Sequence, residues 1–306
     1  MRKIVTSYVK PDMDGISAMY AMAEYLRKTG HDANYYYEGQ ARKEVAIILD
    51  TYNITLDNSI KIDENDEIIL VDTNGIEELP KDIKETQIVQ VIDHHRMTEW
   101  LSKQNNIDAQ IELIGAAATL VAERFFYNDI AISRESAILL YNGIISNTMN
   151  LKINITSEKD IKMAEWLKSK CTEISEQKTK EIFIKKSDIL DRLREEIEVE
   201  FKDPFVTISW SMGQLEIANV EEFLERHEEK VLTVLRSVKQ ENNVQYISVN
   251  CMDIINGYTI VLAENEDTAN LISRATNIKF EGTKAKIDKL VSRKEIVKVI
   301  REKYKK

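Results

Sequence analysis

The sequence is poor in the features that mark secreted and membrane-bound proteins. It has only two cysteines in 306 residues, Cys171 and Cys251, and they lie far apart. A structural disulfide is therefore not expected, and the reducing cytoplasm fits. No run of about 18 apolar residues is present, and the first residues read as a strand without the apolar core of a signal peptide. We expect a cytoplasmic protein with no membrane partner.

Positive charge is also in short supply. Lysine and arginine number 42 against 52 aspartates and glutamates, which gives a net charge of −10. This balance argues against an extended nucleic-acid surface. An acidic protein that acts on an anionic substrate needs metal ions and a few placed cations to reverse the local field.

The first half of the chain alternates strands and helices, and the length of 306 residues suggests two domains. Apolar runs predict strands at 4–8, 34–37, 67–72 and 88–93. Apolar periodicity predicts helices at 15–28, 41–51, 116–127, 134–146, 158–170 and 174–194. Such alternation predicts an α/β domain with a parallel sheet covered on both faces.

The second half has a different pattern. The charged segment 186–196 contains no glycine or proline, so we expect a structured helical linker. Beyond it the pattern predicts strands at 199–201, 205–210, 245–252 and 258–263, and helices at 220–239, 267–275 and 293–304. Asn256-Gly257 is a good hairpin turn between the last two strands. These elements predict a smaller α+β domain.

An acid and two imidazoles follow the strand at 88–93. The chain has four histidines, and two of them are His94 and His95, directly after Asp93. Ligands bind beyond the carboxyl ends of strands in open parallel sheets. The motif is therefore a candidate metal or proton-transfer site, with an ordinary polar loop as the alternative.

Three further aspartates also follow strands. Asp12 and Asp14 stand two apart after the first strand, and Asp72 ends the strand at 67–72. One of the first pair could serve as a helix N-cap, but capping does not require both. Brought together with Asp93 and His94, these carboxylates would be costly without cations to neutralise them. Carboxylate and imidazole donors suit Mn²⁺ or Mg²⁺.

These motifs resemble those of the DHH phosphoesterases. Asp93-His94-His95 resembles the signature that gives the family its name, and 11–14 and Asp72 resemble its first and second motifs. The resemblance is nearest to the manganese-dependent (class II) inorganic pyrophosphatases and the related exopolyphosphatases. Three later segments agree with it in the same order along the chain: 114–119, 143–148 and 291–294.

The resemblance implies a fold, a site and a mechanism. It implies a DHH metal-binding catalytic domain over 1–185, the linker at 186–196, and a DHHA2-like substrate-binding domain over 197–306, with an active-site cleft between the domains. Two ions of Mn²⁺, or of Mg²⁺ or Co²⁺, would activate water for attack on a phosphorylated small molecule. Asp72 would bridge the two ions, Asp12 would bind one, and Asp14 and His94 would bind the other.

It also implies roles outside the metal ligands. His95 would face the substrate as a catalytic residue, and Asp93 would orient the loop or the imidazole. Arg293 and Lys294 would bind substrate oxygens, the first as a fork and the second as a point charge, and Lys152 would assist. A homodimer is a further family expectation.

Three positions depart from the family pattern. Tyr8 stands where the family has a histidine, and Asn147 stands where it has an aspartate, which leaves Asn147 as an uncharged candidate ligand. The acidic segment 195–201 contains no counterpart of a substrate-binding lysine. We therefore expect weaker occupancy of at least one metal position and a substrate other than simple pyrophosphate.

Two hypotheses follow. The chain is either a metal-dependent phosphohydrolase, or a catalytically weakened relative that binds a phosphorylated ligand or nucleotide. A single-strand exonuclease of the wider family fits the acidic charge poorly.

Overall fold

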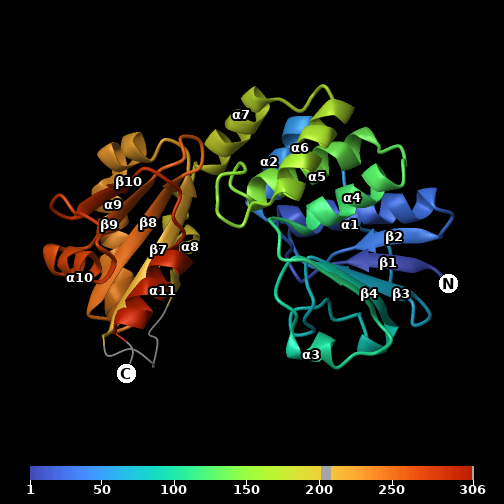
Figure 1. Cartoon of the computed structure of the whole chain (residues 1–306), viewed down its shortest axis with the longest axis horizontal. Helices are drawn as coiled ribbons and strands as arrows, with labels where there is room; N and C mark the ends of the chain where they lie inside the picture. The colour runs from blue at the N-terminus through green and yellow to red at the C-terminus, as the bar shows by residue number, and fades with distance from the viewer. Residues whose placement is uncertain (201–207, 305–306) are drawn as a thin grey trace. The chain divides into compact units, whose positions relative to one another are not determined.

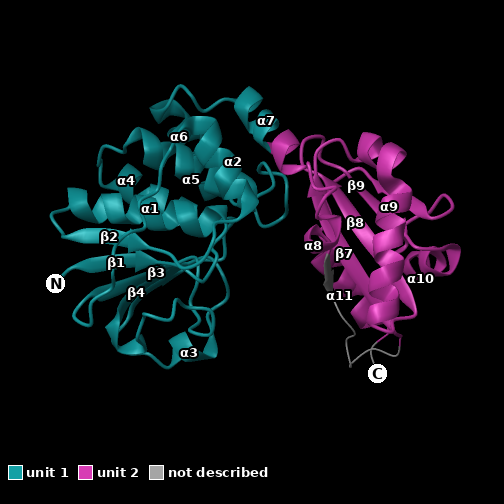
Figure 2. Cartoon of the chain, turned by 180° about the vertical axis from the view of Figure 1, so that it is seen from behind, with its two compact units in different colours: residues 1–182 teal, residues 183–306 magenta. Residues whose placement is uncertain are grey.

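The computed structural model describes residues 1–200 and 208–304. Its residues form two compact units, Met1–Ile182 and Phe183–Lys306, which Figure 2 colours separately. Each unit has its own five-stranded sheet. The α/β class is confirmed, with a parallel sheet in the first unit and a smaller mixed sheet in the second.

The sheet of the first unit is parallel throughout, in the order β2-β1-β3-β4-β5. Val5 of β1 is paired with Tyr35 of β2 and Ile69 of β3. The central strands are β-branched and buried, as expected for strands with neighbours on both sides. The bounds are β1 Lys3–Thr6, β2 Ala33–Tyr36, β3 Glu67–Val71, β4 Ile88–Asp93 and β5 Asp108–Ile111.

The helices of this unit gather mainly on one side of the sheet (Figure 1). They are α1 Met13–Lys28, α2 Lys43–Tyr52, α4 Ala117–Tyr127, α5 Arg134–Asn147 and α6 Glu158–Lys170. The other side carries the short helix α3 (Glu99–Ser102) and loop residues such as Ile76 and Leu79, which pack on Leu70 and Val91. Cover on both faces was expected, and on this side partly buried apolar residues of loops supply most of it.

The strand order places a crevice at one edge of this sheet. The chain runs outward from β1 to β2 in one direction and from β3 to β4 and β5 in the other. At such a reversal the loops after the two central strands diverge, and ligands bind beyond the strand ends. Asp12 follows β1, Asp72 follows β3 and Asp93 ends β4, so the expected site residues share this edge.

The second unit has a sheet of order β10-β9-β8-β7-β6, in which only β7 and β8 are parallel. Helix α9 packs on one face through Leu235, and α10 and α11 pack on the other through Ile272 and Ile296. The strands are β6 Glu198–Glu200, β7 Trp210–Ile217, β8 Tyr246–Asp253, β9 Thr259–Ala263 and β10 Lys284–Ile287, and the helices are α9 Val220–Glu241, α10 Glu266–Thr276 and α11 Arg293–Lys303.

The single helix expected over 174–194 is interrupted, and the segment 186–196 expected as a helical linker is helical only at 186 and 193–196. The structure has α7 (Glu176–Lys186) and the one-turn α8 (Leu193–Glu196), with turns between them. Ser187 ends α7 because its hydroxyl donates back to the Phe183 carbonyl and accepts from the Ala218 N–H. Ile189 and Leu193 are then buried in the core of the second unit, so this segment is part of that unit's packing.

Other boundaries differ by a few residues. Half of the strand expected at 205–210 lies outside the described residues, and β7 begins at Trp210. The short strands β5 and β10 were not expected, because each has only 4 residues and β5 is an exposed edge strand. Among the helices in residues 1–200 and 208–304, none combines the length and apolar character needed to cross a bilayer.

Candidate metal centre

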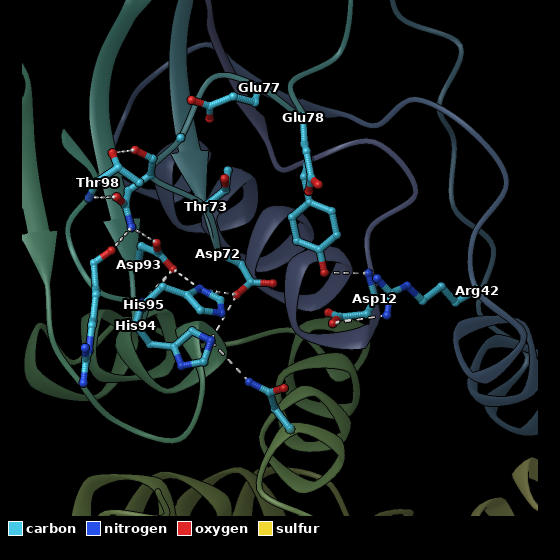
Figure 3. Close-up of a pocket in the computed structure, with 15 residues that line it drawn as sticks. Asp12, Arg42, Asp72, Thr73, Glu77, Glu78, Asp93, His94, His95 and Thr98 are labelled. Atoms are coloured by element: carbon cyan, nitrogen blue, oxygen red, sulfur yellow. Dashed lines mark hydrogen bonds and ion pairs between the residues drawn. The ribbon is translucent and has the colours of Figure 1, made fainter. Parts of the chain in front are cut away.

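A cavity of about 450 Å³ opens at the carboxyl edge of the parallel sheet. Figure 3 shows its lining, with Asp72 lying between the His94–His95 pair and Asp12 in this view. Donor atoms of Asp72, Asp93, His94 and His95 all lie within 4.8 Å of one another. The strand-end motifs therefore meet at one cavity, whose lining residues are Tyr8, Asp12, Arg42, Asp72, Thr73, Asn74, Gly75, Glu77, Glu78, Asp93, His94, His95, Arg96, Thr98 and Asn147.

Asp93 is fully buried and holds the histidine loop in place. Its Oδ1 accepts from the His94 N–H at 2.7 Å, from the His95 N–H at 3.3 Å and from His95 Nδ1 at 2.9 Å. Its Oδ2 accepts from the Asn74 amide. Hydrogen bonds to His95 and Asn74 lower the pKa of Asp93 in spite of its burial. Asp93 is therefore an ionised carboxylate that orients the His95 imidazole and holds the backbone of His94.

His95 is the exposed member of the pair, with 58% of its side chain accessible. The hydrogen bond to Asp93 raises the pKa of His95, and burial opposes this effect. With Nδ1 held by Asp93, the ring presents its other nitrogen away from the carboxylate. It can offer a proton to an anion in the cavity.

His94 is buried and has the opposite arrangement. Its Nδ1 lies 3.0 Å from the Ile114 carbonyl, so Nδ1 carries the hydrogen and Nε2 carries a lone pair. Nε2 faces the carboxylates of Asp72 at 3.2 Å and Asp14 at 3.6 Å. A lone pair aimed at two carboxylates calls for a cation between them.

Asp14 reaches this point from the first turn of α1. Its two oxygens accept from the backbone N–H groups of Ala117 at 2.8 Å and Ala118 at 2.7 Å, at the start of α4. Helix α4 has no side-chain cap of its own, so Asp14 satisfies that helix end. Burial raises the pKa of Asp14 to about 6, with His94 and the two N–H groups acting in the opposite direction.

Asp72 is also buried, in the first position after β3. It has a left-handed backbone with φ of 58°, which is uncommon for a residue other than glycine and marks a constrained turn. Burial first, and then the nearby Asp14 and Asp12, raise the pKa of Asp72 well above the ordinary value. Two buried carboxyls with raised pKa values are held within reach of one imidazole.

Asn147 ends α5 and completes this group. Its amide Nδ2 donates to Asp14 Oδ2 at 3.1 Å, to the Gly115 carbonyl at 2.9 Å, and lies 3.3 Å from His94 Nε2. The amide hydrogens thus point at the same lone pairs that a cation would use. Asn147 could ligate an ion only through its carbonyl oxygen.

Asp12 and Tyr8 form the other side of the cavity. Asp12 is the N-cap of α1, and its Oδ1 accepts from the N–H groups of Asp14 and Gly15. The Tyr8 hydroxyl accepts from the Asp12 N–H at 3.2 Å. Burial and the charges of Asp12 and Asp72 raise the pKa of Tyr8, so it is a neutral phenol. Arg42 lies 3.9 Å from Asp12 Oδ2.

The donor set fits a divalent ion. Asp14, Asp72 and His94 offer two carboxylates and one imidazole lone pair, which is the mixture that Mn²⁺ accepts, and a cation would offset the repulsion that raises both carboxyl pKa values. Around a second position the described residues offer less, because Asp12 has one oxygen engaged in capping and Tyr8 is neutral.

The remaining expected residues are not among those that line the cavity. Lys152 is exposed and is not among the residues lining the cavity. Arg293 and Lys294 begin α11 in the second unit, where Ser292 and Glu295 form a capping box and Gln214 accepts from the Arg293 N–H at 2.7 Å.

Asn74 and Arg42 are among the lining residues that sequence reasoning missed. Asn74 is buried and ties the loops after β3 and β4 together, since its side-chain oxygen accepts from the Thr98 N–H and its amide donates to Asp93 and the Arg96 carbonyl. Its place two residues after Asp72 was the available signal. Arg42 gave none, because it lies in a loop far from the motifs in sequence.

Comparison with known proteins finds similarity to one family and its named relatives. Residues 2–144 match the DHH family, N-terminal domain. The chain is 26% identical over 310 residues to a "Probable manganese-dependent inorganic pyrophosphatase" of Oceanobacillus iheyensis, with 100% of both chains covered. It is 27% identical over 307 residues to a protein of the same name from Streptococcus thermophilus, with 97% of both covered.

Solved structures give the same result. A Methanococcus jannaschii protein assigned to the family II inorganic pyrophosphatases superimposes with a TM-score of 0.68 at 25% identity, covering 99% of both chains. An exopolyphosphatase-related protein from Bacteroides fragilis shares the fold, with a TM-score of 0.51 at 16% identity over 98% of this chain and 91% of its own. The resemblance drawn from the motifs is thus confirmed: residues 2–144 match the DHH family, N-terminal domain, and the chain is similar along its length to manganese-dependent inorganic pyrophosphatases.

Proposed function

We propose that this protein is a manganese-dependent hydrolase of phosphoric anhydrides. The observation that carries the proposal is the meeting of Asp14, Asp72 and the His94 Nε2 lone pair at the carboxyl edge of the sheet. The relatives' names supply the reaction class, and the acidic, buried donor set supplies the requirement for a cation.

In this proposal Asp14, Asp72 and His94 hold one Mn²⁺, with the carbonyl oxygen of Asn147 as a further ligand after its amide turns. Asp12 and Asp72 hold a second ion where it binds. A bound divalent ion supplies a nucleophilic water at neutral pH and offsets charge on the phosphoryl oxygens.

The chain's own side chains do the rest. Asp93 orients the His95 ring and raises the pKa of His95. His95 therefore donates a hydrogen bond or a proton to a phosphoryl oxygen. Arg293 offers a two-pronged contact and Lys294 a point charge for the substrate's outer phosphate. Arg42 lines the cavity near Asp12 and is a further cation for an anionic substrate.

The alternative is a weakened relative that binds a phosphorylated ligand or nucleotide without efficient turnover. Two observations favour it: the Asn147 amide donates into the ligand lone pairs, and Tyr8 is a neutral phenol beside Asp12. Both reduce the negative charge available to metal ions.

The test is a hydrolysis panel with Mn²⁺, Mg²⁺ and Co²⁺ against pyrophosphate, short polyphosphates and dinucleotides, run on wild type and on the Tyr8→His/Asn147→Asp double variant. Turnover by wild type supports the enzyme. No turnover by wild type together with a large gain in the double variant supports the weakened relative. No turnover by either folded protein on any compound rejects the hydrolase.

A further inference from the structure

The backbone of one short turn is hydrogen-bonded to three of the side chains that face the proposed ion. Within 114–118, the Ile114 carbonyl lies 3.0 Å from His94 Nδ1, and the Gly115 carbonyl accepts from Asn147 at 2.9 Å. The N–H groups of Ala117 and Ala118 donate to the two oxygens of Asp14. The orientation of an imidazole, an amide and a carboxylate therefore depends on where this turn sits.

The turn is also hydrogen-bonded to a carboxylate that is not among the residues lining the cavity. Asp160, in the first turn of α6, is fully buried. Its Oδ2 accepts from the Gly115 N–H at 2.9 Å, and its Oδ1 accepts from the Thr119 hydroxyl at 2.5 Å. Asp160 thus contacts Gly115 within the turn and Thr119 directly after it, 45 and 41 residues away in sequence.

Helix capping explains only part of this arrangement. Asp160 forms a capping box with Ser157, whose N–H and hydroxyl both donate to Oδ2. A capping box needs no contact with Gly115 or Thr119. The fit at Gly115 is tight as well, since a Cβ there would meet Thr148 Cγ2 at 2.5 Å and Asp160 Oδ2 at 2.7 Å.

We propose that Asp160 is a positioning residue for the metal centre, acting through the 114–118 turn on His94, Asn147 and Asp14. This deepens the proposed function and rests on it for the metal. Loss of the carboxylate lets the turn shift, so the Ile114 carbonyl no longer fixes the His94 tautomer with Nε2 free for an ion.

The test compares Asp160→Asn with Glu24→Gln. Glu24 is a similarly buried carboxylate whose hydrogen bonds come from Ser133 and Ser136 at the start of α5. Both variants should lose thermal stability, because each removes charge-assisted hydrogen bonds. In Mn²⁺ titrations followed by electron paramagnetic resonance, Asp160→Asn should raise the dissociation constant about ten- to a hundredfold, and Glu24→Gln should leave it unchanged.

A second readout needs no metal. In the metal-free protein, ring ¹⁵N shifts should report His94 with hydrogen on Nδ1 in wild type and in Glu24→Gln, and a mixture of tautomers in Asp160→Asn. Thr119→Val, which removes one hydrogen bond at nearly constant shape, should shift both readouts in the same direction by less. It serves as the test should Asp160→Asn not fold.

Unchanged Mn²⁺ affinity and an unchanged His94 tautomer in Asp160→Asn and Thr119→Val would overturn the positioning role, as would equal weakening by Glu24→Gln. Failure of wild type to bind Mn²⁺ would instead count against the proposed function, and the tautomer measurement would still decide whether Asp160 positions His94.

Discussion

At the residue scale, the centre is made of side chains whose outer atoms are already bonded. The Nδ1 atom of His94 donates to a carbonyl, Asp14 accepts from two N–H groups, and Asp93 accepts from the N–H groups of the loop that it holds. These bonds fix the rotamers in advance, so binding an ion costs little side-chain entropy. Asn147 is the exception, because its amide hydrogens face the ligand lone pairs.

Asn147→Asp should lower the stability of the metal-free protein and raise its affinity for metal. A carboxylate there lies close to buried Asp14, so the metal-free melting temperature should fall by several degrees. The added charge should lower the Mn²⁺ dissociation constant by about tenfold or more. Calorimetric titration and thermal melts with and without Mn²⁺ measure both. Asn142→Asp, in the same helix and also buried, is the control that should destabilise without tightening Mn²⁺ binding.

Manganese binding should weaken as the pH falls. The raised pKa of Asp14, about 6, means that the folded protein keeps this proton where the unfolded chain has lost it, above about pH 4. This group therefore costs the metal-free fold stability as the pH rises through about 6. Mn²⁺ must displace the proton, so its affinity should be about tenfold lower at pH 5 than at pH 7. An affinity independent of pH over this range would contradict the raised pKa.

At the scale of elements, the centre depends on how closely α1 and α5 approach. Asp14 lies on α1, Asn147 on α5, and Gly143 lies at their contact. A Cβ on Gly143 would lie 2.2 Å from Ser17 Oγ and 3.1 Å from the Ala118 Cβ. The glycine is thus needed for close packing of α5 on α1 and α4, although it lowers the intrinsic helix propensity of α5.

Gly143→Ala should therefore destabilise the fold, against the usual effect of replacing a helical glycine. Overpacking costs of about 1–3 kcal/mol exceed the propensity gain of about 1 kcal/mol. Mn²⁺ affinity should fall as well, because the displaced α5 carries Asn147 and the displaced α1 carries Asp14. Urea denaturation and Mn²⁺ titration measure the two effects. A more stable variant with wild-type Mn²⁺ affinity would show that the contact between the helices can accommodate a Cβ at position 143.

At the scale of the whole molecule, the residues proposed to bind metal and those proposed to bind substrate belong to different units. The first unit holds the ion donors, and Arg293 and Lys294 lie in the second. The start of α11 is held by side chains from adjacent strands of its own sheet: Gln214 of β7 accepts from the Arg293 N–H, and Asn250 of β8 donates to the Val291 carbonyl.

Arg293→Ala should separate substrate binding from metal binding. We expect kcat/KM for the preferred phosphoanhydride to fall by at least about tenfold, since a charge-assisted contact is worth about 1.5–3 kcal/mol. Mn²⁺ affinity should not change. Lys298→Ala removes an exposed charge from the same helix and should leave kcat/KM near wild type. A loss of kcat/KM as large in Lys298→Ala would point to general electrostatics.

Much of the fold and of the candidate site could be predicted from local sequence patterns. The strands ending near Asp72 and Asp93 were visible as β-branched runs, because a buried parallel strand must be apolar on both faces. The end of α7 at Lys186 and the strand β5 could not be predicted in this way. A hydrogen bond from Ala218 to Ser187 decides the first, and pairing with β4 decides the second. Arg42 and Asp160 escaped for the same reason: their roles depend on contacts across the fold.

The sequence alone determined the set of donors and the edge of the sheet where they gather, since strand-end residues of parallel strands emerge on one side. Tertiary structure decided the state of each donor. Burial set the proton affinities of Asp14 and Asp72, a carbonyl of a distant turn set the tautomer of His94, and a helix crossing without room for a Cβ brought Asn147 against them. Such effects arise from surroundings that no local stretch of sequence contains.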